Sequence, residues 1–504
     1  MSIGMEYKIL WGDIHNHNTV GLFHYTKGTL ERAIDMAQSH LDFFAFTGHA
    51  QWHDMPEMPN NRHEQWQEGF DRHREVWPRT KQLIKEATDP GRFEAFLGYE
   101  WHSAGFGDHC VIYKEDGPLQ FANHVREIQE HARRSGALLV PHHPGYMRGF
   151  RGANWDWLDE SVSPIVEIIS EHGGAERDRG RFAYTRHGLG PRVTINTIQH
   201  ALALGHHVGF TGSSDDHQAH PGAYNEGQVA VLVPEFTREA IWDALWSRRC
   251  YAASGDKIEL DFRINGQPMG SMLPATSERE IAVNVRGWDE IEKVEVIKNN
   301  RVIHRHFPAD HEPAEGYPWS RRHRCRVEVG WGPWSAFGKP RIAEWDLTVT
   351  VDGARIHQAM PCFQPGPFHE EKRSRILEST ASTCRFQTYT SLAECLNDCP
   401  QNSVVLDVEG PPSATITLSF TKPMVRTEAY TLEEASKNAI TDLTTGFPSD
   451  SFLIHRLVPD ELATAEYGLV DTPSEDRAED YYYLRATQEN GQVAWSSPIW
   501  VANA

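Results

Sequence analysis

The residues best suited to chemistry in this sequence are histidines, and most of them lie in its first half. The chain has 28 histidines, of which 21 fall between His15 and His220. The first two belong to the run Asp13-Ile14-His15-Asn16-His17, which follows a short apolar segment. Imidazole and carboxylate groups together suit zinc, manganese or iron, and one carboxylate can bridge two metals. The pattern therefore predicts a metal site in which several histidines take part.

Further candidates occur at or just after other short apolar segments. They are His24, His49 in Thr47-Gly48-His49, Glu100, His109, the pair His142-His143 before Pro144-Gly145, and the run Ser214-Asp215-Asp216-His217. In a parallel α/β barrel the carboxyl ends of all strands face one mouth. We therefore expect these side chains, far apart in the sequence, to converge on one cavity. His172, with Glu167 and Glu171 nearby, is a candidate to reach the same cavity.

Residues 1–255 alternate strand-like and helix-like segments, which favours an α/β fold. Short β-like apolar runs predict strands, and apolar residues at helical spacing predict helices. Strands are expected at 9–11, 42–47, 93–99, 110–113, 137–140, 165–169, 208–211 and 229–233, and helices at 30–37, 64–86, 121–134, 193–203 and 238–246. Repeated strand-helix units imply a mainly parallel sheet with right-handed crossovers. We therefore predict a distorted TIM-like barrel of about seven such units, a (βα)7 barrel.

Residues 256–504 have a different secondary-structure pattern, because turns and not helices connect their strand-like segments. Asn265-Gly266 and Asn490-Gly491 are typical of hairpin turns. A short helical insertion is expected at 432–439. We predict a β-rich, sandwich-like region, and a division into two subdomains near residue 340 is one arrangement it could take.

Net charge, apolar runs and cysteine content indicate which partners and which cell compartment to expect. The net charge is -21, whereas binding to a nucleic-acid backbone depends on clustered Lys and Arg, so nucleic acid is not expected. The first eight residues resemble no secretory signal, and no run approaches the ~20 apolar residues of a membrane helix. The seven cysteines are scattered, which favours a reducing compartment over a disulfide framework. We expect a cytoplasmic protein acting on a small molecule without a membrane, and a homo-oligomer remains open.

The order of these motifs resembles that of the PHP domain, the polymerase and histidinol phosphatase superfamily. The resemblance lies in His15-x-His17, a histidine in a Thr-x-His corner, Glu100, a later histidine, His143-Pro144-Gly145 and Asp215-x-His217, and it covers roughly residues 8 to 255. The segments 249–255 and 262–266, with Tyr482-Tyr483-Leu484-Arg485, look like a PHP-related family of unassigned function that carries a β-rich C-terminal extension.

This resemblance implies a site for two or three divalent ions of zinc, manganese or iron. Its first metal would be held by His15, His17, Glu100 and Asp215; Glu100 would bridge to a second held with His109 and His143; the third would be bound by His24, His49 and His217. His24 and His109 rest on order and spacing, with His102 and His142 as rivals. Where the family usually has Thr-Asp-His, this chain has Gly48, which leaves occupancy of the third site open.

The expected function is metal-dependent hydrolysis. A metal-bridging hydroxide would attack, and Asp215, His217 or His172 would shuttle the proton to the leaving group. Family precedent favours a phosphoesterase acting on a small anionic substrate. The alternative is hydrolysis of a carboxylic ester, amide or lactone by the same centre, and a third option is a non-catalytic, metal-stabilised binding protein. Several arginines could hold an anionic substrate, although salt bridges are their commoner role: Arg148, Arg151, Arg177, Arg179 and Arg181.

Overall fold

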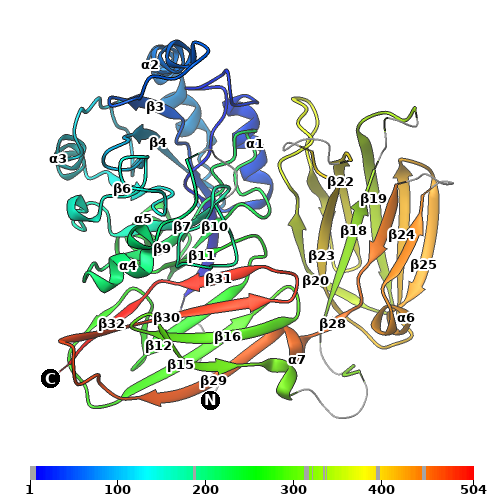
Figure 1. Cartoon of the computed structure of the whole chain (residues 1–504). Helices are drawn as coiled ribbons and strands as arrows, with labels where there is room; N and C mark the ends of the chain where they lie inside the picture. The colour runs from blue at the N-terminus through cyan, green and yellow to red at the C-terminus, as the bar shows by residue number, and fades with distance from the viewer. Residues whose placement is uncertain are drawn as a thin grey trace.

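The computed structural model describes residues 7–184, 189–311, 317–319, 322–332, 335, 338–392, 398–444 and 450–503. The first half alternates strands and helices, as the sequence predicts (Figure 1). Its strands are β1 (Lys8–Asp13), β2 (Phe43–Ala45), β3 (His49–Trp52), β4 (Glu94–His102), β5 (His109–Tyr113), β6 (Leu138–Pro141), β7 (Ile165–Ser170), β8 (Gly173–Gly174), β9 (Gly209–Gly212), β10 (Gln228–Val233) and β11 (Cys250–Ala253). Its helices are α1 (Leu30–His40), α2 (Arg62–Ala87), α3 (Val125–Ser135), α4 (Ile198–Ala203) and α5 (Arg238–Trp246), with short 3-10 turns at Trp155–Trp157 and Thr194–Asn196.

The sheet of this half is mixed, which corrects the prediction of a mainly parallel one. Strand β2 runs parallel to β1 and β4, but β10 is antiparallel to β1, and β5 is antiparallel to β4 and β6. The link between β4 and β5 is only residues 103–108, and a parallel crossover needs about a dozen residues or more. Within the described residues β7, β8 and β9 form a sheet of their own, so no closed TIM-like barrel is confirmed.

Helix starts follow local sequence signals. Thr29 caps α1 by accepting a hydrogen bond from the amide of Arg32, and Thr237 caps α5 in the same way from Ala240. Such caps satisfy amides that have no partner inside the helix. Strand β4 is buried along its whole length, as expected for a strand covered on both faces. These elements form the rigid frame from which the site residues project.

The second half is rich in strands, as predicted. They are β12 (Glu259–Ile264), β13 (Gln267–Pro268), β14 (Met272–Leu273), β15 (Arg279–Arg286), β16 (Ile291–Lys298), β17 (Arg301–His306), β18 (His323–Gly330), β19 (Ala343–Asp352), β20 (Arg355–Cys362), β21 (Arg375–Ser379), β22 (Thr383–Thr390), β23 (Gln401–Glu409), β24 (Thr415–Lys422), β25 (Arg426–Thr431), β26 (Ile440–Leu443), β27 (Ser451–Ile454), β28 (Val458–Pro459), β29 (Thr464–Asp471), β30 (Glu479–Gln488), β31 (Val493–Ser496) and β32 (Ile499–Ala502). The helices are α6 (Leu432–Lys437), which matches the predicted insertion, and α7 (Asp460–Ala463), and a 3-10 turn covers Pro308–His311.

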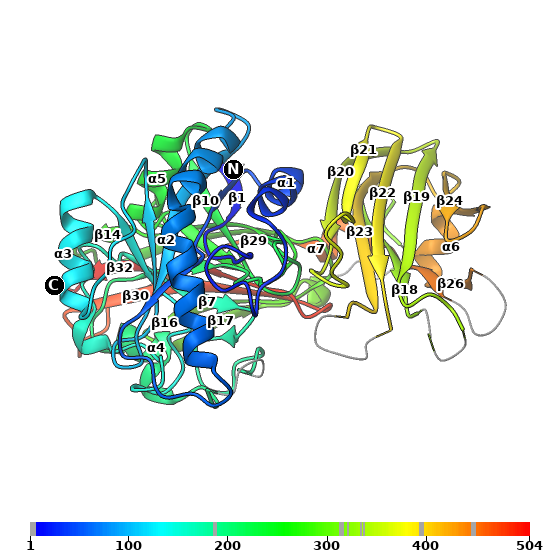
Figure 2. The same cartoon turned by 90° about the horizontal axis from the view of Figure 1, so that it is seen from above.

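These strands fall into two groups. Strands β16, β30, β31 and β32 extend the sheet of the first half, because β31 pairs with β11, and a second sheet of β12, β15 and β29 packs against them around Phe262 and Leu484. Strands β18 to β27 form two facing sheets with a core around Trp345, Leu406 and Phe452, and this sandwich stands beside the rest of the molecule (Figure 2). The domain boundary near residue 255 stays a prediction, although strand pairing crosses it.

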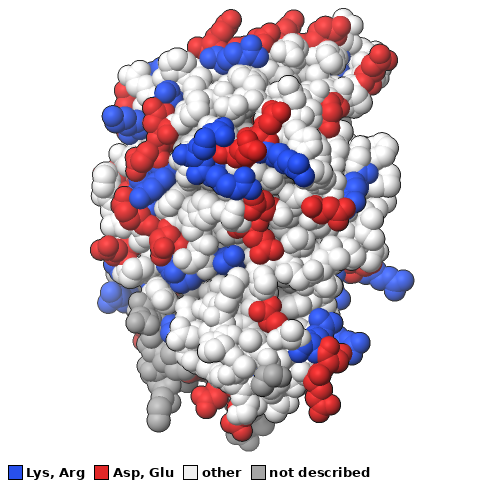
Figure 3. Space-filling view, turned by 90° about the vertical axis from the view of Figure 1, so that its left-hand side faces the viewer, with Lys and Arg blue, Asp and Glu red and all other residues white. Residues whose placement is uncertain are grey.

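The surface carries both signs of charge. Figure 3 shows Lys and Arg interspersed with Asp and Glu over one face of the molecule. Among the described helices, none has the length and apolar character needed to cross a bilayer.

Candidate metal centre

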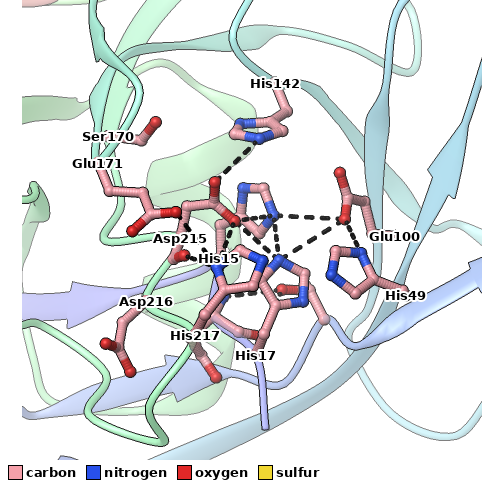
Figure 4. A network of polar contacts seen from close by, with 12 residues as sticks. His15, His17, His49, Glu100, His142, Ser170, Glu171, Asp215, Asp216 and His217 are labelled. Atoms are coloured by element: carbon pink, nitrogen blue, oxygen red, sulfur yellow. Dashed lines mark hydrogen bonds and ion pairs between the residues drawn. The ribbon is translucent and has the colours of Figure 1, made fainter. Parts of the chain in front are cut away.

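Two of the predicted motifs lie side by side and hold each other in place. The amide of Asp215 donates to the carbonyl of His15 and the amide of His17 donates to the carbonyl of Asp216, each at 2.8 Å. The segments therefore run parallel, with Asn16 opposite Asp216. Because side chains alternate along an extended chain, His15 and His17 share a side. Their Nε2 atoms are 3.1 Å apart (Figure 4).

Asp215 is the centre of this arrangement. Its Oδ1 lies 2.8 Å from His17 Nε2 and 3.3 Å from His15 Nε2, while its Oδ2 lies 3.0 Å from His172 Nε2 and 3.3 Å from His142 Nε2. Asp215 adopts a left-handed backbone conformation, with φ of 56°, which is uncommon outside glycine and is found at functional sites. One carboxylate thus faces four imidazoles.

Glu100, the second carboxylate, faces the same cluster from β4. Its Oε2 lies 2.7 Å from His49 Nδ1, 3.3 Å from His102 Nε2 and 3.6 Å from His17 Nε2. His49 begins β3, which runs parallel to β4. Glu100 and His102 are two residues apart on one strand, so they project from the same face.

Other polar groups set the tautomers of these histidines. Glu167 of β7 accepts from His15 Nδ1 at 3.0 Å and from His142 Nδ1 at 2.6 Å. Asp108 lies 2.8 Å from His102 Nδ1, and the hydroxyl of Tyr146 lies 2.8 Å from His172 Nδ1. A carboxylate on one ring nitrogen keeps the proton there and leaves the other nitrogen with a lone pair, as in many metal sites. The Nε2 atoms of His15, His142 and His102 are the ones left facing Asp215 or Glu100.

The electrostatics of the cluster favour bound positive charge. Burial raises the pKa of Glu100 and of Asp215, but the surrounding histidines outweigh burial and hold both values well below the usual range. Burial lowers the pKa of His142, yet Glu167 and Asp215 outweigh that effect and raise it to about 9. Burial and the neighbouring His217 lower the pKa of His17 to about 4. Ionised carboxylates buried together need positive charge beside them, which a protonated His142 can supply and a bound metal ion would replace.

The donor set fits divalent metal ions. Several buried atoms have no hydrogen-bond partner within the described chain, among them Glu100 Oε1, His49 Nε2 and both ring nitrogens of His143. Sets of three side chains whose ligand atoms are close enough to share one ion include His15, His17 and Glu100; His49, Glu100 and His102; His17, His49 and His217; and His142, His143 and His172. Such overlapping sets are typical of a polynuclear centre and differ from the closed four-ligand structural zinc site.

Seven of the nine predicted ligands lie in or beside this cluster. They are His15, His17, His49, Glu100, His143, Asp215 and His217. His143 Nε2 lies 3.4 Å from Asp108. His217 is the most exposed of them, with a side chain 22% exposed, and its Nδ1 lies 3.3 Å from Glu171 Oε1. His172, predicted as a proton carrier, also reaches the cluster. The ligand and catalytic roles of all these residues stay predictions.

His24 and His109 lie elsewhere, and their rivals His102 and His142 are in the cluster. His24 is exposed, and its Nε2 lies 3.1 Å from Glu68 Oε2 of α2. His109 Nδ1 donates to the carbonyl of Gly107, and its ring packs near Trp101. His109 is paired directly opposite Trp101 on β4, so both project from the face opposite to Glu100. The Glu-x-His spacing of Glu100 and His102, which puts both side chains on one face of a strand, is the sequence signal that could have identified His102 as a candidate ligand.

Arg151 is a cationic member of the site, from the loop after His143. It is buried, its Nε donates to Asp108 Oδ2 at 2.7 Å, and its Nη2 lies 4.0 Å from Glu100 Oε1. Its backbone is left-handed, with φ of 66°. Its remaining Nη1 makes no hydrogen bond to the described part of the chain. The guanidinium is therefore held beside the cluster with donor capacity to spare.

Comparisons with known proteins add little about activity. No family model matches the sequence. An uncharacterised protein of Chlamydia pneumoniae is 38% identical over 267 residues, which cover 46% of this chain and 41% of that protein. One of Chlamydia trachomatis is 27% identical over 173 residues, which cover 31% of this chain and 28% of that protein. The chain thus spans less than half the length of these curated relatives.

Among solved structures, a two-domain protein from Bacteroides vulgatus contains a predicted PHP-like metal-dependent phosphoesterase. It is 10% identical, and the match covers 84% of this chain and 96% of that chain with a TM-score of 0.32. A likeness at this level identifies neither the fold nor the activity of this chain.

Proposed function

We propose that this chain is a metal-dependent hydrolase, and that its substrate is a small phosphoester. The observation that carries the proposal is that eight histidines gather in one buried cluster, and that seven of them, all but His143, face the ionised carboxylates of Glu100 and Asp215. His15, His17, Glu100 and Asp215 would hold one divalent ion. His142, His143 and His172 would provide ligands for a second, and His49 and His102, which share a set with Glu100, would extend the first. Bound divalent ions supply Lewis acidity and lower the pKa of a coordinated water.

Side chains of the protein would orient the ligands and carry protons. Glu167 holds the protons of His15 and His142 on Nδ1, which keeps both Nε2 atoms available as ligands. His217, paired with Glu171 and closest to solvent, is placed to give a proton from its ring to a leaving group. His172 Nε2 lies 3.0 Å from Asp215 Oδ2, so this nitrogen can serve as a metal ligand or, where no ion binds it, as a proton carrier.

Arg151 favours a phosphoryl over an acyl substrate. Metal-assisted hydrolysis serves both phosphorus and carbonyl centres, so the cluster alone does not choose between them. An arginine with unused N–H donors beside the cluster matches a dianionic phosphoryl group better than a neutral ester, amide or lactone.

The test begins with metal content. Elemental mass spectrometry of protein purified without a tag or chelator should find two or three divalent ions per chain, and a His17→Ala variant should lose metal. The metal-loaded protein should hydrolyse p-nitrophenyl phosphate faster than p-nitrophenyl acetate, and Arg151→Ala should lower the first rate more than the second. Little metal after reconstitution would refute the hydrolase proposal, and a preference for the acetate would favour the acyl alternative.

A further inference from the structure

A second site is indicated by a cleft on another part of the molecule. It lies between the loop at residues 175–182 and strands β16, β30 and β31, and its volume is about 350 Å³. Six cations line it: Arg177, Arg179, Arg181, Lys293, Arg305 and Arg485. Three carboxylates also line it, so its formal charge is +3 in a chain whose net charge is -21.

The floor of the cleft is electrically balanced. Arg485 is buried and lies 2.6 Å from both Glu176 Oε1 and Glu295 Oε2. Arg305 lies 2.9 Å from Glu295 Oε1. Glu176 also accepts from the indole of Trp495 and the hydroxyl of Tyr483. These two carboxylates are therefore fully engaged by partners within the floor of the cleft.

The excess positive charge of the cleft lies at its mouth. Arg181 and Lys293 share one carboxylate, Glu292, at 3.3 and 2.7 Å. Arg177 lies no closer than 3.9 Å to Glu176, which the floor already uses. Arg179 has no ion-pair or hydrogen-bond partner in the part of the chain that the structure describes. Asp178 does not compensate for it, because Asp178 accepts from Thr194 and does not line the cleft.

The loop that carries the arginines is held in shape without them. Arg192 donates from Nη1 to the carbonyls of Gly174 and Phe182, at the two ends of the loop. Arg179 has a left-handed backbone, with φ of 53°, which is uncommon for a residue with a side chain. Exposed arginines would normally reduce their mutual repulsion by spreading into solvent. Here the fold concentrates them at one opening.

We propose that this cleft binds a small molecule through a phosphate or pyrophosphate group. Planar guanidinium groups match phosphoryl oxygens in pairs, and the cleft has the size of a small-molecule site. The residues that line it are separate from those of the metal centre, so the site does not depend on the proposed hydrolase function. The bound molecule is an effector or, in a reading that rests on the proposed hydrolase function, a substrate whose distal phosphate reaches the cleft.

Isothermal titration with inorganic pyrophosphate, in buffer free of divalent metal, tests the proposal. Wild-type protein should bind it, and an Arg177→Ala/Arg179→Ala double variant should bind at least about tenfold more weakly, because charge-assisted hydrogen bonds are lost. Arg74→Ala, which removes an exposed arginine paired with Asp71, is the matched control and should bind like the wild type. His17→Ala, which damages only the metal centre, should also bind normally.

Each result decides the question. Absence of binding to the wild type overturns the site, as does a loss in His17→Ala with binding retained by the double arginine variant, since the anion would then sit at the metal centre. Equal binding of succinate overturns the assignment to phosphate. Activity distinguishes the two sources of ligand: a distal-phosphate subsite predicts a raised KM in the double variant, whereas an effector site predicts a rate that responds to added pyrophosphate only when the arginines are present.

Discussion

The carboxylate of Glu167 should control metal affinity although we do not place it among the ligands. It accepts from Nδ1 of both His15 and His142, at 3.0 and 2.6 Å. In Glu167→Gln one oxygen becomes an NH2 group, which cannot accept. One of the two imidazoles must then move its proton to Nε2 and lose the lone pair that faces Asp215.

The size of the effect follows from this geometry. Loss of a hydrogen-bond partner behind one ligand typically lowers metal affinity by about 10- to 100-fold, which corresponds to about 1.4–2.7 kcal/mol. Because Glu167 serves two histidines and also contributes a negative charge, we expect a value near the upper end. Competition with a chromophoric chelator measures the metal dissociation constant, and thermal unfolding checks that the variant is folded.

Glu160→Gln is the matched control. Glu160 also faces two histidines, His206 and His207, at 3.0 and 3.5 Å, but at a partly exposed position outside the cluster. Its replacement should leave metal affinity unchanged. Should folded Glu167→Gln bind metal as tightly as Glu160→Gln, the assignment of His15 and His142 as ligands oriented by Glu167 would be wrong.

Three other outcomes are expected. His102→Ala should weaken metal binding by at least about tenfold while His109→Ala, equally buried, should not; elemental analysis after dialysis against metal measures both. His73 is buried, and burial lowers its pKa to about 4. Below about pH 6.5 the unfolded chain therefore takes up a proton that the folded chain does not. Urea unfolding of the wild type should show about 2 kcal/mol of stability lost between pH 7 and 5 from this group, and His73→Gln should not show this loss. Arg326→Met, which leaves buried Asp256 without its ion pair at 3.1 Å, should destabilise the protein by about 3 kcal/mol in the same assay.

Controls and contrary results are specific to each case. Arg385 forms a partly exposed pair with Asp346, and Arg385→Met should cost less than about 1 kcal/mol; equal losses for the two arginine variants would contradict the argument from burial. An identical pH dependence in wild type and His73→Gln would show that folding does not lower the pKa of His73. Greater metal loss in His109→Ala than in His102→Ala would reverse the assignment drawn from strand alternation.

Much of the local structure and part of the site could be predicted from the sequence alone. Helix α5 was expected at its observed bounds, and α2 within about two residues at each end, because apolar spacing and caps are local signals. The motifs His15-x-His17 and Asp215-x-His217 were identified for the same reason, since each places two side chains on one side of an extended segment. A cluster of histidines in the first half that could bind metal was therefore foreseeable.

Tertiary structure decided the rest. Sheet pairing turns His102 toward Glu100 and His109 away from it, and a sequence does not state which strand face is covered. Glu167 and Arg151 enter the site from segments far along the chain. The return of β30 and β31 to the first sheet, which creates the arginine-lined cleft, is a long-range pairing as well. Local patterns depend on neighbours in sequence, whereas these contacts depend on which distant surfaces pack together, and only the folded chain determines that.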